Sequence, residues 1–287
     1  MKNCFLACLI LLSGICQAQD ADWRIPQQNN LVYLQLDTGT VVIELAPFMA
    51  PNHVKQFQAL VREGFYDGLD FYRVIDGFVA QAGDISEQKP SDNKAPLQAE
   101  FTRPLSKDDS FRLVQSPEFL AAETGILHGF AAGRDPKDKV EWLLHCYGVV
   151  AMARSNEINT GTTDFYINIG QAPRHLDRNM SVFGRVIYGM QHIQAVKRGD
   201  PNNGGVIDDP AKRSKILSAH IGSDLGASEQ LNLHIQNEFG DTYANKLASS
   251  RSLDNPFFYY KGTGNIDVCY RGVASELIPA EKATEQD

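Results

Sequence analysis

The sequence lacks the features that would indicate membrane insertion or nucleic-acid binding. Beyond its first residues it has no apolar run long enough to cross a bilayer, so we expect no stable membrane insertion. It also lacks an excess of basic residues. Its 27 Lys and Arg stand against 35 Asp and Glu, and the resulting net charge of -8 argues against a nucleic-acid partner.

Motifs of several common enzyme classes are also missing. There is no H-E-x-x-H, no G-x-S-x-G, no P-loop, and no G-x-G-x-x-G placed between a strand and a helix. The seven His are scattered, and no Cys/His cluster has the spacing of metal ligands. We therefore expect neither a metal site nor a cofactor.

Cysteine is scarce, and three of the five lie in an N-terminal segment typical of exported proteins. Lys2 precedes an apolar run over 5–15 that is too short to span a bilayer, and the small residue Ala18 follows. This pattern predicts a signal peptide over residues 1–18. A lipoprotein attached through Cys16 is an alternative, which the bulky residue before that cysteine disfavours. We expect the protein to be exported to the periplasm.

The two remaining cysteines, Cys146 and Cys269, would lie in an oxidising compartment. One interpretation is a disulfide that joins the body of the fold to its C-terminal tail. The other is a pair of buried free thiols, since cysteine is a common small core residue.

The most informative segment is 71–84, which reads F-Y-R-V-I-D-G-F-V-A-Q-A-G-D. Two short apolar runs flank an Asp-Gly pair, a pattern that predicts a β-hairpin. Side chains alternate along a strand, so we expect Phe71, Arg73 and Ile75 to share one face. An arginine between two apolar residues is rarely buried without a partner. It either pairs with a carboxylate or lines a pocket, and we favour the pocket.

The rest of the chain suggests many short strands and few helices, which favours a β-barrel or sandwich. A helix is expected to begin near Pro51 and to end at Gly64. The connection over about 85–146 is expected to be a surface insertion, with a short helix at 118–122. Elsewhere we expect a helix at 190–196 and strands at 31–36, 41–45, 149–153, 164–169, 181–186 and 215–221.

The pattern changes from residue 223 onward. Segments 257–260 and 266–270 suggest a second hairpin. About 65 residues are too few for a robust core, so we expect this extension, residues 223–287, to pack on the main body, with a polar end from residue 280. An amphipathic helix interrupted by Gly240 is predicted by apolar residues at every fourth position: Leu231, Ile235, Phe239, Tyr243 and Leu247.

The 71–84 segment closely resembles the signature of the cyclophilins, peptidyl-prolyl cis-trans isomerases with the pattern F-H-R-V-I-x-G-F-x-x-Q-G-G-D. The resemblance implies a mainly β fold, an eight-stranded antiparallel barrel capped by two helices, over residues 30–222. The insertion and a small α+β extension lie outside the shared pattern. Other segments resemble family segments and follow one another in the family's order. They are 31–45, 50–66, 148–154 (G-V-V-A-M-A-R), 161–167, which resembles the family pattern G-x-x-Q-F-F-I, and parts of 176–190.

The resemblance also implies which residues form the site. Arg73 matches the catalytic arginine of the family, and Gln81 matches a glutamine that can hold it. Tyr72 stands where the family usually has a His and is expected to point away from the pocket. The implied substrate-binding residues are Phe78, Val79, Ala153, Arg154, Thr163, Phe165, His175, Leu176 and Met180.

These features imply a monomeric isomerase that rotates Xaa-Pro bonds in exported proteins, with proline-containing polypeptides as its partners. An alternative is a peptide-binding module or chaperone that keeps the pocket but has lost most turnover. Departures from the family pattern at Thr163, His175 and Met180 favour this alternative. A barrel that holds a small apolar ligand is a third interpretation, and it is disfavoured because side chains fill the interior of an eight-stranded barrel.

Overall fold

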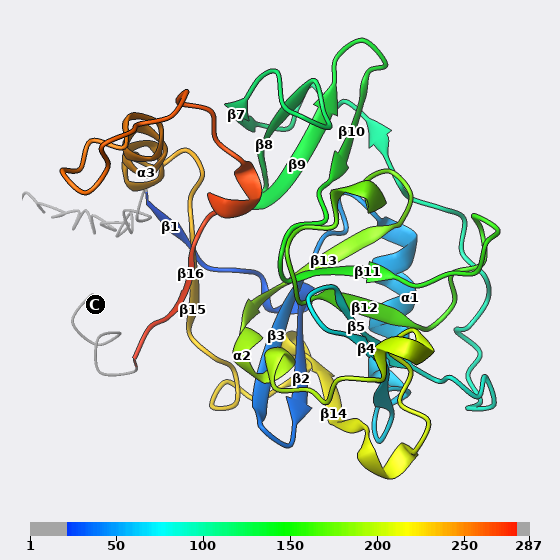
Figure 1. The fold of residues 1–287 in the computed structure, drawn as a ribbon. Coiled ribbons are helices and arrows are strands. Elements are labelled where there is room, and N and C mark those ends of the chain that lie inside the picture. Colours follow the sequence, from blue (N-terminus) through cyan, green and yellow to red (C-terminus); the bar gives the residue numbers. More distant parts are fainter. Residues whose placement is uncertain (1–21, 280–287) are drawn as a thin grey trace, which may run out of the picture.

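The computed structural model describes residues 22–279, and its central feature is a closed antiparallel barrel (Figure 1). The predicted eight-stranded barrel is thereby confirmed. The signal peptide predicted over 1–18, the alternative at Cys16 and the polar end from residue 280 lie outside the described residues. In order around the barrel the strands are β11 (Val149–Met152), β12 (Phe165–Asn168), β5 (Val79–Gly83), β4 (Asp70–Ile75), β14 (Ser214–Ile221), β2 (Leu31–Leu36), β3 (Gly39–Leu45) and β13 (Val182–Tyr188).

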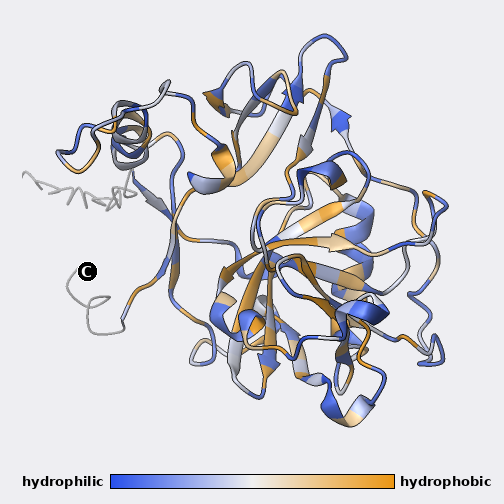
Figure 2. Ribbon diagram, viewed as in Figure 1, coloured by the Kyte–Doolittle hydropathy of each residue, from blue (hydrophilic) through white to orange (hydrophobic). Residues whose placement is uncertain are grey.

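Large apolar side chains fill the inside of the barrel, and Figure 2 shows the hydrophobic residues gathered along its strands. Phe57, Phe165 and Phe183 are fully buried, and the Phe57 ring lies 5.4 Å from that of Phe165 and 4.9 Å from that of Phe183. Burial of this apolar area is the main source of stability. Side chains therefore occupy the space in which the third interpretation places a small ligand.

Two helices lie on opposite sides of the barrel (Figure 1). Helix α1 (Pro51–Arg62) begins with a proline in its first turn, where the missing N–H leaves no helical hydrogen bond unmade. Gly64 ends this helix as predicted. Its φ of 65° lets the chain turn back, so that the Phe65 N–H donates to the Leu60 carbonyl. Helix α2 (Met190–Gln194) is shorter.

The insertion between β5 and β11 forms a five-stranded antiparallel sheet, which the sequence did not predict. The expected helix at 118–122 is wrong, because these residues form an irregular loop that follows Pro117. The Glu118 side chain is held by Arg174 of the barrel rather than by a helical neighbour. In order across the sheet the strands are β6 (Arg103–Pro104), β10 (Val140–Leu143), β9 (Phe130–Asp135), β8 (Glu123–Leu127) and β7 (Phe111–Gln115).

Within residues 223–279, the C-terminal extension contains one α-helix and two strands. The amphipathic helix predicted from Leu231 is wrong before Gly240, where the chain forms a strand. The helical part after Gly240 is confirmed. The hairpin predicted at 257–260 and 266–270 is also wrong, since these residues form an exposed loop and a 3-10 turn. The elements are β15 (Leu233–Gln236), helix α3 (Asp241–Ser252) and β16 (Ser275–Leu277), with β15 paired to β16 and to β1 (Trp23–Arg24).

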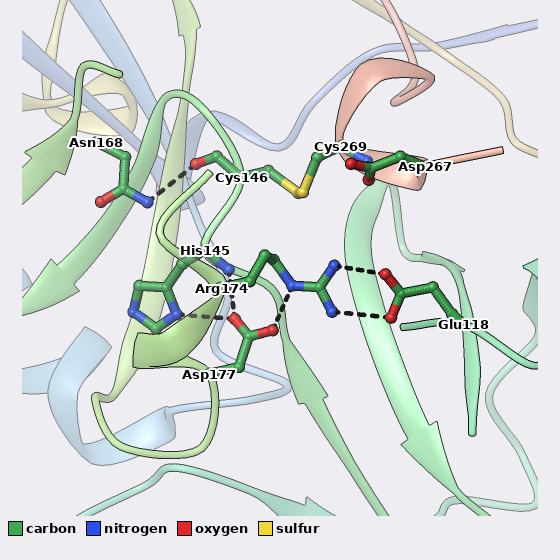
Figure 3. The surroundings of a disulfide bond; sticks show 8 residues. All are labelled: Glu118, His145, Cys146, Asn168, Arg174, Asp177, Asp267 and Cys269. Atoms are coloured by element: carbon green, nitrogen blue, oxygen red, sulfur yellow. Dashed lines mark hydrogen bonds and ion pairs between the residues drawn. A yellow bond between two sulfur atoms is a disulfide. The ribbon is translucent and has the colours of Figure 1, made fainter. Parts of the chain in front are cut away.

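A disulfide and polar contacts tie the extension to the rest of the molecule. Cys146 and Cys269 are bonded, with Sγ atoms 1.99 Å apart, which confirms the predicted disulfide over the free-thiol alternative (Figure 3). The Ser275 hydroxyl donates to the Ile187 carbonyl at 2.5 Å.

None of the helices within residues 22–279 is both apolar enough and long enough to cross a membrane. Short 3-10 turns complete the fold: η1 (Gln28–Asn30), η2 (Arg174–Leu176), η3 (Pro201–Asn203), η4 (Pro210–Lys212), η5 (Gly222–Asp224) and η6 (Val268–Tyr270).

Candidate functional site

A β-bulge in β4 places Arg73 on the outer wall of the barrel. Phe71 and Val74 both point into the core, although three positions separate them, because the β4–β5 register shifts between Asp70 and Arg73. The expectation that Phe71 and Arg73 share a face is therefore wrong. Arg73 instead lies beside Gln81, its partner across the β4–β5 pair.

The hairpin that joins β4 to β5 forms at the predicted Asp-Gly pair. Gly77 has a φ of 70°, which a residue with a side chain adopts only with strain. On β5 the alternation is regular, since Ala80 and Ala82 face the core while Val79 and Gln81 do not. Two outward side chains of β5 therefore stand next to Arg73.

A cavity of about 200 Å³ lies against this outer wall. Strands β4, β5 and β12 form one side of it, and the chain after β11, the η2 turn and the chain before β13 form the other. The cavity is lined by Arg73, Phe78, Val79, Gln81, Ala153, Arg154, Tyr166, Leu176 and Met180. The structure thus brings together eight of the eleven residues that the family resemblance implied.

Arg73 is held by neutral groups. Its Nη1 donates to Gln81 Oε1 at 3.0 Å, and its Nε donates to the Gly204 carbonyl at 3.0 Å. Val74 N–H donates to the Gly205 carbonyl at 2.7 Å, which fastens this glycine loop along β4. Within residues 22–279 no carboxylate forms an ion pair with Arg73, so the guanidinium can still bind a group that enters the cavity.

A chain of hydrogen bonds fixes the Gln81 amide. Its Nε2 donates to the Tyr72 hydroxyl, and that hydroxyl donates to Asp164 Oδ2 at 2.5 Å. Burial raises the pKa of Asp164, and it also raises the pKa of Tyr72. Because Nε2 is engaged by Tyr72, the amide oxygen of Gln81 must face Arg73. Tyr72 does not line the cavity, but it is coupled to it through Gln81.

Phe165 and Thr163 are not in the cavity, contrary to the sequence prediction. The Phe165 ring lies in the barrel core, 5.5 Å from the Tyr66 ring, and the Thr163 carbonyl accepts from the Tyr66 hydroxyl. Side chains alternate on β12, so Tyr166, the next residue, faces outward and lines the cavity. Counting back from Ile167 in the G-x-x-Q-F-F-I pattern would have placed Tyr166 there.

Residues near the rim also differ in what they contact. The exposed His175 ring stacks on Phe78, with centroids 6.1 Å apart and planes at 18°. Arg154 lines the cavity, but its guanidinium donates to the backbone carbonyls of its own loop and to that of Asn179. Leu176 and Met180 supply apolar surface. The cavity thus combines apolar surface with two arginines, Arg73 and Arg154, which neutral groups hold in place.

Behind the cavity, Tyr166 leads into a buried polar chain. Its hydroxyl lies 3.0 Å from His145 Nε2, and His145 Nδ1 lies 3.1 Å from Asp177 Oδ1. Asp177 also binds Arg174, which contacts both carboxylate oxygens of Glu118 from the insertion (Figure 3). Burial acts to lower the pKa of Arg174, but Asp177 and Glu118 outweigh it and hold that pKa above its ordinary value. No motif in the sequence indicated this series of buried polar contacts.

A closed eight-stranded barrel with an apolar cavity and an arginine held by neutral groups on its outer wall defines a cyclophilin-like protein. The comparisons with known proteins agree, and the chain belongs to the cyclophilin-type peptidyl-prolyl cis-trans isomerase family, whose sequence model matches residues 31–221. Its relatives in that family are named as enzymes of this reaction.

Two relatives and one solved structure show how far the similarity reaches. A probable peptidyl-prolyl cis-trans isomerase of Brucella suis is 30% identical over 78% of this chain and 97% of its own length. A peptidyl-prolyl cis-trans isomerase of Arabidopsis thaliana is also 30% identical, over 75% of this chain and 80% of its own. The crystal structure of cyclophilin AquaCyp293 from Hirschia baltica covers 90% of this chain and 94% of its own, with 27% identity and a TM-score of 0.71.

Proposed function

We propose that this chain catalyses rotation about Xaa-Pro bonds in exported polypeptides as they fold in the periplasm, with Arg73 as the catalytic residue. The observation that carries the proposal is the Arg73 guanidinium, which neutral partners fix at the edge of an apolar cavity. Slow proline isomerisation limits the folding of many proteins, and an exported foldase would shorten that step.

The chemistry needs no bond to be made or broken. Resonance between the amide nitrogen and the carbonyl gives a rotation barrier of about 18–20 kcal/mol. In the twisted transition state the prolyl nitrogen becomes pyramidal, and its lone pair can accept a hydrogen bond. A donor that finds its acceptor only in that state stabilises it selectively, which is the condition for catalysis. An acceleration of about 10⁵ requires about 7 kcal/mol.

The residues around Arg73 would supply the rest. We propose that the proline ring rests on Phe78, Leu176 and Met180, which exclude water from the guanidinium and strengthen its hydrogen bonds. Gln81 holds Arg73 in one orientation, so little conformational entropy is lost when the transition state forms. The backbone beside Ala153 would hold the flanking peptide.

Turnover of a Xaa-Pro peptide by the wild type, Arg73→Ala and Arg73→Lys tests this proposal. We expect Arg73→Ala to lower kcat/KM by about 10²–10³, because the charged donor is lost. Lysine should restore only part of it, since it cannot bind Gln81 and the substrate with one planar group. Arg62→Ala, which removes a surface ion pair with Asp224, is the control and should change nothing.

The outcomes separate the two candidate functions. A wild type that binds the peptide without turnover would identify the peptide-binding module instead. Equal activity in Arg73→Ala would remove the arginine from the mechanism. Export has its own test: the mass of the protein recovered from a periplasmic fraction should correspond to cleavage after Ala18, and an uncleaved chain would contradict the proposed localisation.

A further inference from the structure

A second and larger cavity lies next to the proposed proline site. Its volume is about 440 Å³, and three parts of the chain line it. The loop over 117–120 of the insertion forms one wall, Ala172 and Arg174 of the barrel form another, and residues 265–267 of the extension form the third. None of these walls belongs to the barrel strands.

Polar contacts join the three walls to one another. Arg174 of the barrel contacts both carboxylate oxygens of Glu118, at 3.2 and 3.3 Å, and both side chains are largely buried (Figure 3). On the other side, Gln115 accepts from the Ile266 N–H at 3.1 Å and donates to Asn265. The cavity is therefore held open before any ligand binds, which lowers the entropic cost of binding.

Two large apolar side chains at this cavity are exposed to solvent. Phe119 is 91% exposed and Leu120 is 47% exposed, although the loop that carries them is fastened on both sides. Large apolar side chains gathered at a fixed concave surface are typical of a site for an apolar partner. The buried Ile266 adds apolar surface to the opposite wall.

The two cavities share the η2 turn. Arg174 lines the larger cavity and Leu176 lines the proline site, and His175 is exposed between them. A 3-10 turn rises about 2 Å per residue, so the turn is about 6 Å long. Since an extended peptide advances about 3.3 Å per residue, a polypeptide bound at the proline site reaches across the turn within a few residues.

We propose that the larger cavity is a second subsite for the same polypeptide, which takes an apolar side chain about three to five residues away from the proline. The proposal rests on the proposed function, because it needs a proline held beside Arg73. It gives the insertion and the extension a role in substrate selection, since each supplies a wall. Glu118 and Arg174 position the loop, and Phe119 and Leu120 contact the substrate.

The test uses pairs of Xaa-Pro peptides that differ in one side chain. Each pair has Leu or Ala at one position three, four or five residues from the proline, on either side. Binding is followed by fluorescence anisotropy and turnover by kcat/KM, with the wild type, the double variant Phe119→Ala/Leu120→Ala, and the control Tyr259→Ala. Tyr259 is fully exposed and lies outside both cavities.

We expect the wild type to favour the Leu peptide by about five- to tenfold in at least one pair, mainly through KM, as partial burial of one Leu allows. The ratio of kcat/KM for the Leu peptide to kcat/KM for the Ala peptide should fall to about one in Phe119→Ala/Leu120→Ala. It should stay unchanged in Tyr259→Ala. A ratio near one in the wild type for every pair, or a ratio that survives in the double variant, overturns the subsite.

Two further measurements keep the proposals apart. If the wild type turns over no peptide, yet binding still favours Leu and the double variant loses that preference, the isomerase mechanism fails and the subsite stands. Sedimentation tests another occupant of the cavity. A wild-type dimer that Phe119→Ala/Leu120→Ala dissociates would assign the cavity to a second copy of the chain and would overturn the proposal.

Discussion

Replacing Tyr72 with Phe tests whether the buried chain behind Arg73 controls the site. The substitution removes a hydroxyl that accepts from Gln81 and donates to Asp164 at 2.5 Å, while the ring stays. A hydrogen bond to an ionised partner contributes about 1.5–3 kcal/mol. We expect Tyr72→Phe to lower the free energy of unfolding by about that amount at a pH where Asp164 is ionised.

The same variant should change how stability depends on pH. Burial raises the pKa of Asp164, and the hydrogen bond from Tyr72 acts against that rise. The folded protein therefore holds the Asp164 proton more tightly than the unfolded chain. Hence the free energy of unfolding falls as pH rises from the unfolded pKa to the folded pKa, and levels off above it. Without the hydroxyl, the pKa of Asp164 in the folded protein rises further. The free energy of unfolding of Tyr72→Phe should therefore decrease by more than that of the wild type, and the decrease should extend to a higher pH.

Urea unfolding of the wild type, Tyr72→Phe and Asp164→Asn, repeated between about pH 4 and pH 8, measures this effect. Asp164→Asn removes the titration and should remove this part of the pH dependence. We also expect kcat/KM of Tyr72→Phe to fall by about tenfold, equivalent to about 1.4 kcal/mol, because Gln81 no longer holds Arg73 in one orientation. Identical pH dependence in the wild type and Tyr72→Phe would refute the reasoning, as would undiminished turnover.

Two further predictions concern the framework of the fold. Replacing Cys146 and Cys269 with serine should lower the free energy of unfolding by about 2–4 kcal/mol, since the bond joins residues 123 positions apart. The measurement is urea unfolding with and without a reductant. A reductant that shifts the unfolding midpoint of the variant as much as that of the wild type would contradict the prediction. Phe165→Ala should cost about 3–5 kcal/mol, because the ring lies in the core. A Phe165→Ala protein with unchanged thermal stability would contradict that placement.

The sequence predicts the barrel well because its strands follow simple rules. Alternation, an Asp-Gly turn and an ordered series of family segments identify the strands and one terminating residue, Gly64. The bulge in β4 breaks the first of these rules. It depends on how β4 pairs with β5 and with the Gly205 loop, which are contacts between distant parts of the chain. Local pattern therefore placed Phe71 and Arg73 on one face, and tertiary pairing separated them.

Outside the barrel the same rules failed for identifiable reasons. A four-residue apolar repeat is an even spacing, so Leu231 and Ile235 can share a helix face or a strand face equally well. In the insertion, Gly133 lies within β9 and not at a turn. A Cβ at this position would lie 2.7 Å from the Trp142 ring of the neighbouring strand. Glycine is needed there for close packing inside a strand, a role that a sequence pattern does not distinguish from a turn.

The unpredicted chain of polar contacts from Tyr166 to Glu118 explains how the insertion can influence the proposed site. Arg73 and Gln81 come from one hairpin, and Arg73 is held by Gln81 and by the Gly204 carbonyl, so neither the insertion nor the extension supports them. The opposite wall of the proposed proline site differs, because the η2 turn is fastened through Arg174 to Glu118 of the insertion. The residue after the buried His145 of this chain is Cys146, which is bonded to the extension. Under the proposed function, changes in either added segment can therefore alter which substrates fit while leaving Arg73 in place.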